Sequence, residues 1–149
     1  METSEEQTST VIDASGLILG RMASIVAKRL LSEESITIVN AEKTALSGKR
    51  LSRVKEARAF LEIGHPRKGP FHPRRPDQIV QKSIRGMLPH RQPKGIMALK
   101  RLQVFLSMPD EFKNAPVESI PEAHISRLKG SYLTLGELAK EIGYKQVGE

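Results

Sequence analysis

The sequence contains no cysteine and no tryptophan, and aromatic residues make up only 4% of its 149 positions. The absence of cysteine excludes disulfide bridges and cysteine-ligated zinc sites. An apolar fraction of 38% allows a small hydrophobic core, but it is poor material for the large enclosed pocket of many enzymes. At this length we expect one domain, with little chain left for a second.

Long uncharged runs are also missing. The longest stretch without Asp, Glu, Lys or Arg covers residues 102–109, whereas a membrane-spanning helix needs about 20 apolar residues. The first nine residues are polar and acidic and have no apolar segment of the kind found in secretory signals. We therefore expect residues 1–9 to form a disordered acidic leader.

The net charge of +7 is concentrated in the middle of the chain. Residues 43–101 hold 16 basic and 3 acidic side chains, a net charge of +13. The flanks are mildly acidic, at −4 for residues 1–42 and −2 for residues 102–149. Such a concentration favours a polyanionic partner, and nucleic acid in particular, over a solvated surface or an anionic lipid.

Hydrophobic periodicity in the first third predicts a βαβ unit. Residues 11–13 indicate a short strand, and apolar residues recur at helical spacing from Leu19 to Leu30. The β-branched run at 36–40 indicates a buried strand. A parallel strand pair with a right-handed crossover follows. Residues 44–46 indicate a further short strand.

The basic middle predicts helices separated by an irregular segment. Residues 49–63 favour a helix with basic residues on more than one face, and prolines and glycines exclude regular structure from 64 to 76. A helix follows Pro76, and Pro93 begins another that reaches Arg101. The apolar residues expected to face the core are Leu51, Val54 and Leu61 in the first helix and Val80, Ile84, Met87 and Leu88 in the second. Asp77 is the expected N-cap of the second helix. Residues 104–106 indicate the next strand.

The last forty residues predict an arm that ends in a helix. Polar sequence with Pro116 and Pro121 is typical of an extended segment. Thr134 and Glu137 form a capping box for a helix over 134–143, and Gly143 is its stop signal. The expected divisions are the leader at 1–9, an α/β domain at 10–108 and the arm at 109–149. The apolar stripe of the last helix packs either on the protein's own core or on a neighbouring protein.

The segment from 64 to 94 carries the strongest functional signal. Eight cations stand there against one acid, Asp77. Proline reduces the entropy that a basic loop loses on binding, and the arginine fork matches phosphate and stacks on exposed bases. The aromatic rings of Phe71 and His72 could stack in the same way. The residues that we expect to bind RNA are Arg21, Lys49, Arg50, Arg53, Arg67, Lys68, Phe71, His72, Arg74, Arg75, Lys82, Arg85, His90, Arg91 and Lys94.

Several blocks of sequence in a fixed order resemble a known family. These blocks read VIDASGLILGRMASIVAK, ITIVNAEKTALSG, KGPFHPRRPDQIV, SIRGMLPH and LKRLQVF. They resemble the L-thirteen family of large-subunit ribosomal proteins, in its archaeal and eukaryotic cytosolic branch, over roughly residues 11–109. The closing SYLTLGELAKEIGY is similar to the tails of archaeal members.

The resemblance implies a three-layer α/β/α domain with a small, mostly parallel sheet of about four strands, followed by the arm and its short helix. It implies a structural, non-catalytic constituent of the large subunit in the cytoplasm. Its partners would be large-subunit ribosomal RNA and neighbouring ribosomal proteins, with no membrane, no small-molecule substrate, no cofactor and no metal. The family's RNA-facing positions map onto Arg67, Lys68, Arg74, Arg75, Arg85 and Lys94.

The residues give less support to a nucleotide-binding enzyme or to a metal site. The turn between Gly16 and Gly20 lacks the glycine spacing and the lysine of a P-loop. It either holds an RNA phosphate with help from Arg21 or only allows close strand-to-helix packing. His65, His72 and His90 have only Asp77 as a possible acidic partner for a metal and stand among cations, so we expect them to donate to phosphate or to stack.

Two rivals remain after these. Asp13 and Glu42 follow expected strands, where catalytic sites form in open parallel sheets, but we interpret them as structural acids. A free RNA-binding regulator or assembly chaperone could use the same basic segment, and physical reasoning from the residues does not separate it from a ribosomal protein.

Overall fold

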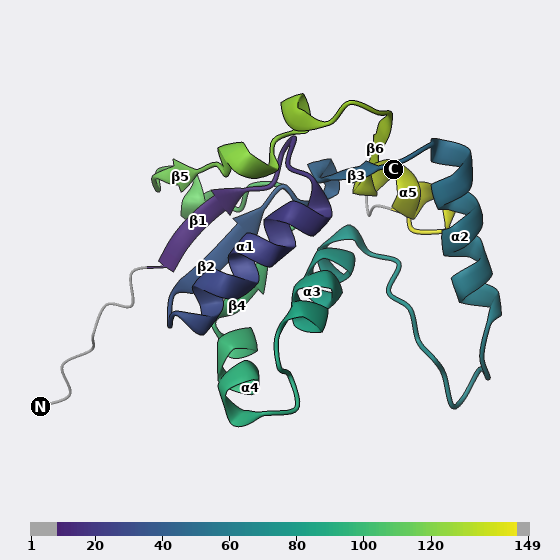
Figure 1. Cartoon of the computed structure of the whole chain (residues 1–149), viewed down its shortest axis with the longest axis horizontal. Helices are drawn as coiled ribbons and strands as arrows, with labels where there is room; N and C mark the ends of the chain where they lie inside the picture. Colours follow the sequence, from purple (N-terminus) through teal and green to yellow (C-terminus); the bar gives the residue numbers. More distant parts are fainter. Residues whose placement is uncertain (1–8, 146–149) are drawn as a thin grey trace, which may run out of the picture.

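A four-stranded parallel sheet organises the protein, and the computed structural model describes residues 9–145 (Figure 1). The strand order is β4-β2-β1-β5. The central strands β1 (Ser9–Asp13) and β2 (Ser35–Val39) pair along their whole length. Four of the five residues of β2 are buried, as expected for its β-branched run, because a strand that is covered on both faces needs apolar residues along its whole length. The expected α/β class with a mostly parallel sheet of four strands is confirmed.

Helix α1 (Leu19–Leu31) connects the two central strands, and its apolar stripe is buried as predicted. The stripe recurs every three or four residues, so one face of the helix meets the core while Arg21, Ser24 and Lys28 stay exposed. Helices α3 (Pro76–Met87) and α4 (Pro93–Lys100) both pack against α1. None of the helices between residues 9 and 145 is long and apolar enough to cross a membrane.

Helix α2 (Arg50–Glu62) stands apart from this core on the right of Figure 1. Of its predicted inward residues, Val54 is buried and Leu61 is partly buried. The prediction for Leu51 is wrong, because its side chain is 86% exposed. Leu51 lies on the same side of α2 as Val54, one turn nearer to the start of the helix, but its exposure shows that no other described element covers this first turn.

Three other local predictions need correction. Arg75, and not Asp77, occupies the N-cap of α3, because Pro76 takes the first helical position where its missing N–H is harmless. Met87 is 46% exposed, since the helix ends there and the chain turns away. Strand β4 covers Leu102–Val104, two residues earlier than expected, because Ile36 and Ile38 of β2 pair with these residues.

The segment after residue 109 is part of the fold. It adds β5 (Val117–Glu118), which pairs in parallel with β1, and β6 (Tyr132–Thr134), which pairs antiparallel with β3 (Ala45–Ser47). The short helices η1 (Ala41–Lys43), η2 (Asp110–Phe112), η3 (Pro121–Ala123) and η4 (Ile125–Arg127) complete the connections. Of the expected leader, Ser9 begins β1 and residues 1–8 lie outside the described residues.

Helix α5 (Leu135–Glu141) docks on the protein's own core. Thr134 and Glu137 form the predicted capping box, and Gly143 adopts the positive φ of a helix stop. Leu135, Leu138 and Ala139 are buried against η1, α2 and α3. Of the two possibilities left open by the sequence, the structure therefore shows docking within the chain.

Candidate nucleic-acid interface

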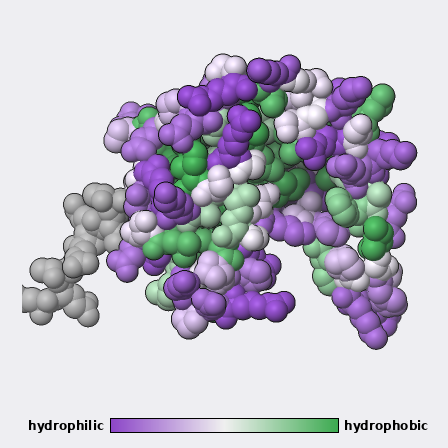
Figure 2. Space-filling view, viewed as in Figure 1, coloured by the Kyte–Doolittle hydropathy of each residue, from purple (hydrophilic) through white to green (hydrophobic). Residues whose placement is uncertain are grey.

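A loop over residues 63–75 joins the far end of α2 to the start of α3 and forms the tip of a projecting lobe (Figures 1 and 2). Figure 2 shows this tapered lobe as mainly hydrophilic at its end. The expectation of irregular structure here is confirmed. Within the loop, His65 and Gly69 exchange two backbone hydrogen bonds of 2.9 Å. The loop is therefore a closed turn and not a free strand of chain.

Unpaired cations gather on the loop and on the two helices that follow it. All of these side chains are exposed. No ion pair among residues 9–145 involves them, whereas Arg50, Arg53, Arg58 and Arg75 of the basic middle are paired with acids. They are Arg67, Lys68, Arg74, Arg85, Arg91 and Lys94. Each was expected from the sequence to face RNA, and each is free to bind an anion.

Three of the expected arginines are instead paired with acids of the protein. Arg53 Nε donates to the Ser47 carbonyl oxygen at 2.6 Å, and its guanidinium lies 3.5 Å from Glu56. Arg50 pairs with Glu141 at 2.7 Å. Arg75 pairs with Asp77 at 3.2 Å, although half of its side chain is still exposed. The contacts of Arg53 with Ser47 and of Arg50 with Glu141 tie α2 to the body of the protein.

Glu141 joins α2 to α5 through two arginines. Its carboxylate accepts from Arg50 and also lies 3.3 Å from Arg58. These partners are separated by 91 and 83 residues along the chain, so no local sequence pattern could have indicated the contact. Lys49 is exposed beside this contact, at the N-cap of α2.

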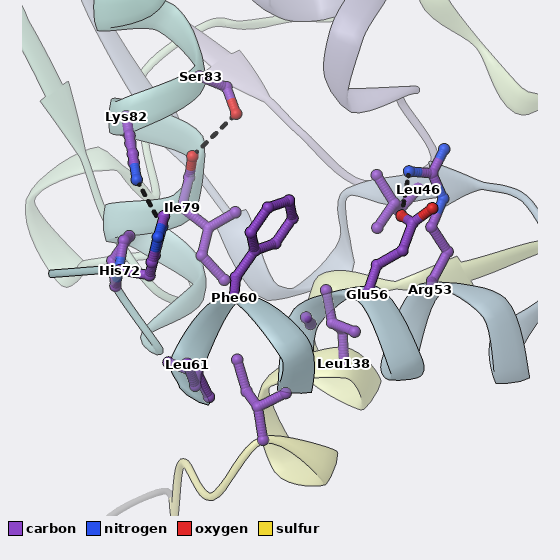
Figure 3. A pocket seen from close by; sticks show the side chains of 13 residues that line it. Leu46, Arg53, Glu56, Phe60, Leu61, His72, Ile79, Lys82, Ser83 and Leu138 are labelled. Atoms are coloured by element: carbon purple, nitrogen blue, oxygen red, sulfur yellow. Dashed lines mark hydrogen bonds and ion pairs between the residues drawn. The ribbon is translucent and has the colours of Figure 1, made fainter. Parts of the chain in front are cut away.

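A small apolar pocket between α2, α3 and α5 holds His72 in place (Figure 3). The His72 ring lies 5.4 Å from the Phe60 ring, and its Nδ1 lies 3.0 Å from Lys82 Nζ. The lysine is a donor, so His72 accepts this hydrogen bond through an unprotonated Nδ1. The contacts place His72 and Lys82 in the scaffold that orients the loop against α3.

The other two histidines of the segment differ from each other. His65 Nδ1 accepts a 3.1 Å hydrogen bond from the Arg67 backbone N–H inside the loop turn. His90 Nδ1 is buried and has no hydrogen-bond partner among residues 9–145. Within the same residues, no three His, Asp or Glu side chains form a group that could hold a metal ion.

The turn before α1 places Arg21 over a second hollow. Arg21 and Arg53 both line this space, together with Ser47 and Ser83. An added Cβ at Gly20 would meet nothing within 4 Å, so close packing does not explain this glycine. The first turn of α1 carries no acid and no side-chain cap. The phosphate interpretation of Arg21 stays a prediction.

The acids that follow the strands bind the backbone. Asp13 Oδ1 accepts from the Ser15 N–H at 2.9 Å and from Asn40 Nδ2 at 3.0 Å. Burial alone would raise the pKa of Asp13, but these hydrogen bonds and nearby Lys43 together lower it. Glu42 Oε2 accepts from the Ser107 N–H at 2.9 Å. Both acids therefore have the structural role that we expected.

Arg29 is a cation of α1 that serves the fold. It pairs with Glu34 at 2.9 Å and with Glu118 of β5 at 3.3 Å. Burial would lower the pKa of Arg29, but the two carboxylates raise it overall. Positive charge on the α1 side is thus partly neutralised within the protein, in contrast to the loop.

Comparison with known proteins shows the family of the chain. Residues 7–111 match the model of the family described as ribosomal protein L13. The chain is 48% identical over 138 residues to the large ribosomal subunit protein uL13 of Methanosarcina barkeri, which covers 91% of this chain and 99% of that protein. The uL13 proteins of Methanopyrus kandleri and Aeropyrum pernix are 45% and 39% identical, over 93% and 94% of this chain and 89% and 93% of theirs.

Proposed function

Because the chain belongs to the archaeal branch of the ribosomal protein L13 family, we infer that it is a structural constituent of the large ribosomal subunit. The family is one of structural proteins, so the proposed role is binding and not catalysis. Its site of action is the ribosome in the cytoplasm, and its partners are ribosomal RNA and neighbouring large-subunit proteins. The proposed role involves no membrane and no small-molecule substrate.

We propose that the loop 63–75, with α3 and the start of α4, binds ribosomal RNA. One observation carries the proposal: six exposed cations of this region have no ion-pair partner among residues 9–145, whereas Arg29, Arg50, Arg53 and Arg58 elsewhere are paired. Cations that the fold leaves unpaired can replace the counterions of RNA phosphates, which is the main source of affinity for a polyanion. Such contacts position the protein and do not read base sequence.

Charge reversal on two exposed helical cations tests this proposal. Arg85 lies on α3 within the proposed surface, and Lys28 lies on α1 outside it. We expect Arg85→Glu to reduce incorporation into large subunits, and to make binding to large-subunit RNA less steeply salt-dependent by about one ion. Lys28→Glu should incorporate nearly as the wild type does. Equal incorporation of the two variants would contradict the proposed surface.

A further inference from the structure

An open hollow lies between the end of α2 and the loop 63–75. Its volume is about 400 Å³, within the roughly 300–1,000 Å³ typical of small-ligand sites. Leu61, Ile63 and Phe71 supply apolar surface, and Arg74 lines the same space. A hollow whose lining is partly apolar and partly polar, with a cation at its side, suits a ligand that combines a flat apolar part with negative charge.

Phe71 is the unusual element of this hollow. Its side chain is 72% exposed, and no ring of the described residues stacks on it. The ring rests against Gly69, where an added Cβ would lie 3.1 Å from Phe71 Cδ2. Contact with a backbone lacking a side chain holds the ring while leaving most of its surface to solvent. Ile63, which is 60% exposed, lines the same hollow, so the ring is part of an exposed apolar patch of the kind that marks binding surfaces.

The loop is built before any partner binds. The two hydrogen bonds between His65 and Gly69 close the turn. At its neck, an added Cβ on Gly64 would lie only 2.6 Å from Pro70 Cδ, so the two sides of the loop touch there. A hollow with a preformed wall loses little conformational entropy when a ligand enters.

The charges around the ring identify the class of ligand. Arg74 lines the hollow together with Phe71, while exposed Arg67 and Lys68 belong to the adjoining turn between His65 and Gly69. Glu62 is the only acid among the residues that line the hollow. A nucleotide satisfies both features, because its base offers a flat ring and its phosphate a negative charge. A base inside a duplex is already stacked and paired, so only an unpaired base could enter.

We propose that this hollow takes one unpaired nucleobase of the ribosomal RNA, which stacks on Phe71 while Arg74 binds an adjacent phosphate. The inference rests on the proposed function and deepens it. Stacking is indifferent to base identity, since every base has a flat face. The contact therefore recognises the shape of the RNA, namely an exposed base at a fixed distance from the phosphates bound by α3.

Substitutions at Phe71 test the stacking contact, with deproteinised large-subunit RNA from an archaeon as the probe. We expect Phe71→Ala to weaken binding by about 5- to 150-fold, the loss found for removal of a stacked aromatic. Phe71→Leu should lose nearly as much, because it keeps apolar area without a flat ring, and Phe71→Tyr should bind as the wild type does. Tyr132→Ala is the matched control, since it removes a half-exposed ring from β6.

Ultraviolet cross-linking of reconstituted subunits provides the second measurement. The proposal expects a cross-link between the peptide containing Phe71 and a nucleotide that chemical probing shows to be unpaired. Wild-type affinity in Phe71→Ala or Phe71→Leu, a large loss in Phe71→Tyr, or a cross-link to a paired nucleotide would overturn the base site while leaving RNA binding intact. Failure of the wild-type protein to bind the RNA would instead overturn the proposed function.

Discussion

Asp13 connects the ends of the two central strands, and its ionisation is coupled to folding. Burial opposes the charged form, but the hydrogen bonds from Ser15 and Asn40 outweigh it and lower the pKa of Asp13. A carboxyl group with a lowered pKa in the folded state stabilises the protein above its unfolded pKa of about 3.9, and that contribution is lost as the pH falls through the folded value.

Asp13→Asn should therefore destabilise the protein near neutral pH, by about 1 kcal/mol, as expected when charge-assisted hydrogen bonds become neutral ones. The difference in free energy of unfolding should be constant down to about pH 5 and should narrow below about pH 4. Denaturant unfolding at a series of pH values measures it. Asp110→Asn, at an exposed ion pair with Lys113, is the control and should change stability little. A deficit that grows as the pH falls would contradict the role of the Asp13 carboxylate.

At the scale of residues, burial was predicted best for helices that pack one face against the core. All six apolar positions of α1 between Leu19 and Leu30 are buried as expected. Leu51 and Met87 fit the same spacing and are nevertheless exposed. Periodicity shows that a residue lies on a given side of a helix, but not that another element covers that side. Coverage depends on tertiary packing, which local sequence does not encode.

Helix α4 depends on a close approach at Gly95. This glycine is buried, and a Cβ added to it would collide with the backbone carbonyl of Pro89, which lies in the loop between α3 and α4. Gly86 of α3 is also helical, but an added Cβ there would meet nothing within 4 Å. The two glycines are matched in secondary structure and differ in the space around them.

Gly95→Ala should destabilise the protein by about 1–3 kcal/mol, the usual penalty for overpacking. Gly86→Ala should stabilise it by about 0.5–1 kcal/mol, because alanine loses less backbone entropy in a helix. Thermal unfolding of the two variants beside the wild type gives both values. Equal stabilities for the two variants would show that the loop before α4 yields easily and does not fix this helix.

At the scale of elements, the long periodic helices, the central strands and the short strand β3 were predictable, and the strands β5 and β6 were not. Strands β5 and β6 have two and three residues, too few to produce an alternation that can be recognised. They pair with β1 and β3, which lie about a hundred residues earlier, so their register is set by distant partners. The polar composition after residue 109 indicated an extended arm, yet these pairings are invisible in it.

The basic middle of the chain was the most informative feature at the scale of the whole molecule, but only some of its charges are left unpaired by the fold. Arg50, Arg53 and Arg58 fasten α2 to the protein, while the loop and α3 present unpaired cations. Composition cannot distinguish these groups, because the acids that hold α2 include Glu141 near the end of the chain. The proposed RNA-binding surface is therefore limited to the projecting lobe and the adjacent helices, where the unpaired cations lie.

Sedimentation of the native protein, with and without RNase and at low and moderate salt, distinguishes a constituent of the large subunit from a free RNA-binding protein. We expect co-migration with the large ribosomal subunit that survives moderate salt and is lost after RNase treatment. Migration as a small species that RNase does not affect would contradict it. The family relationship would then describe ancestry alone, and a free protein would have to account for the unpaired cations of the loop.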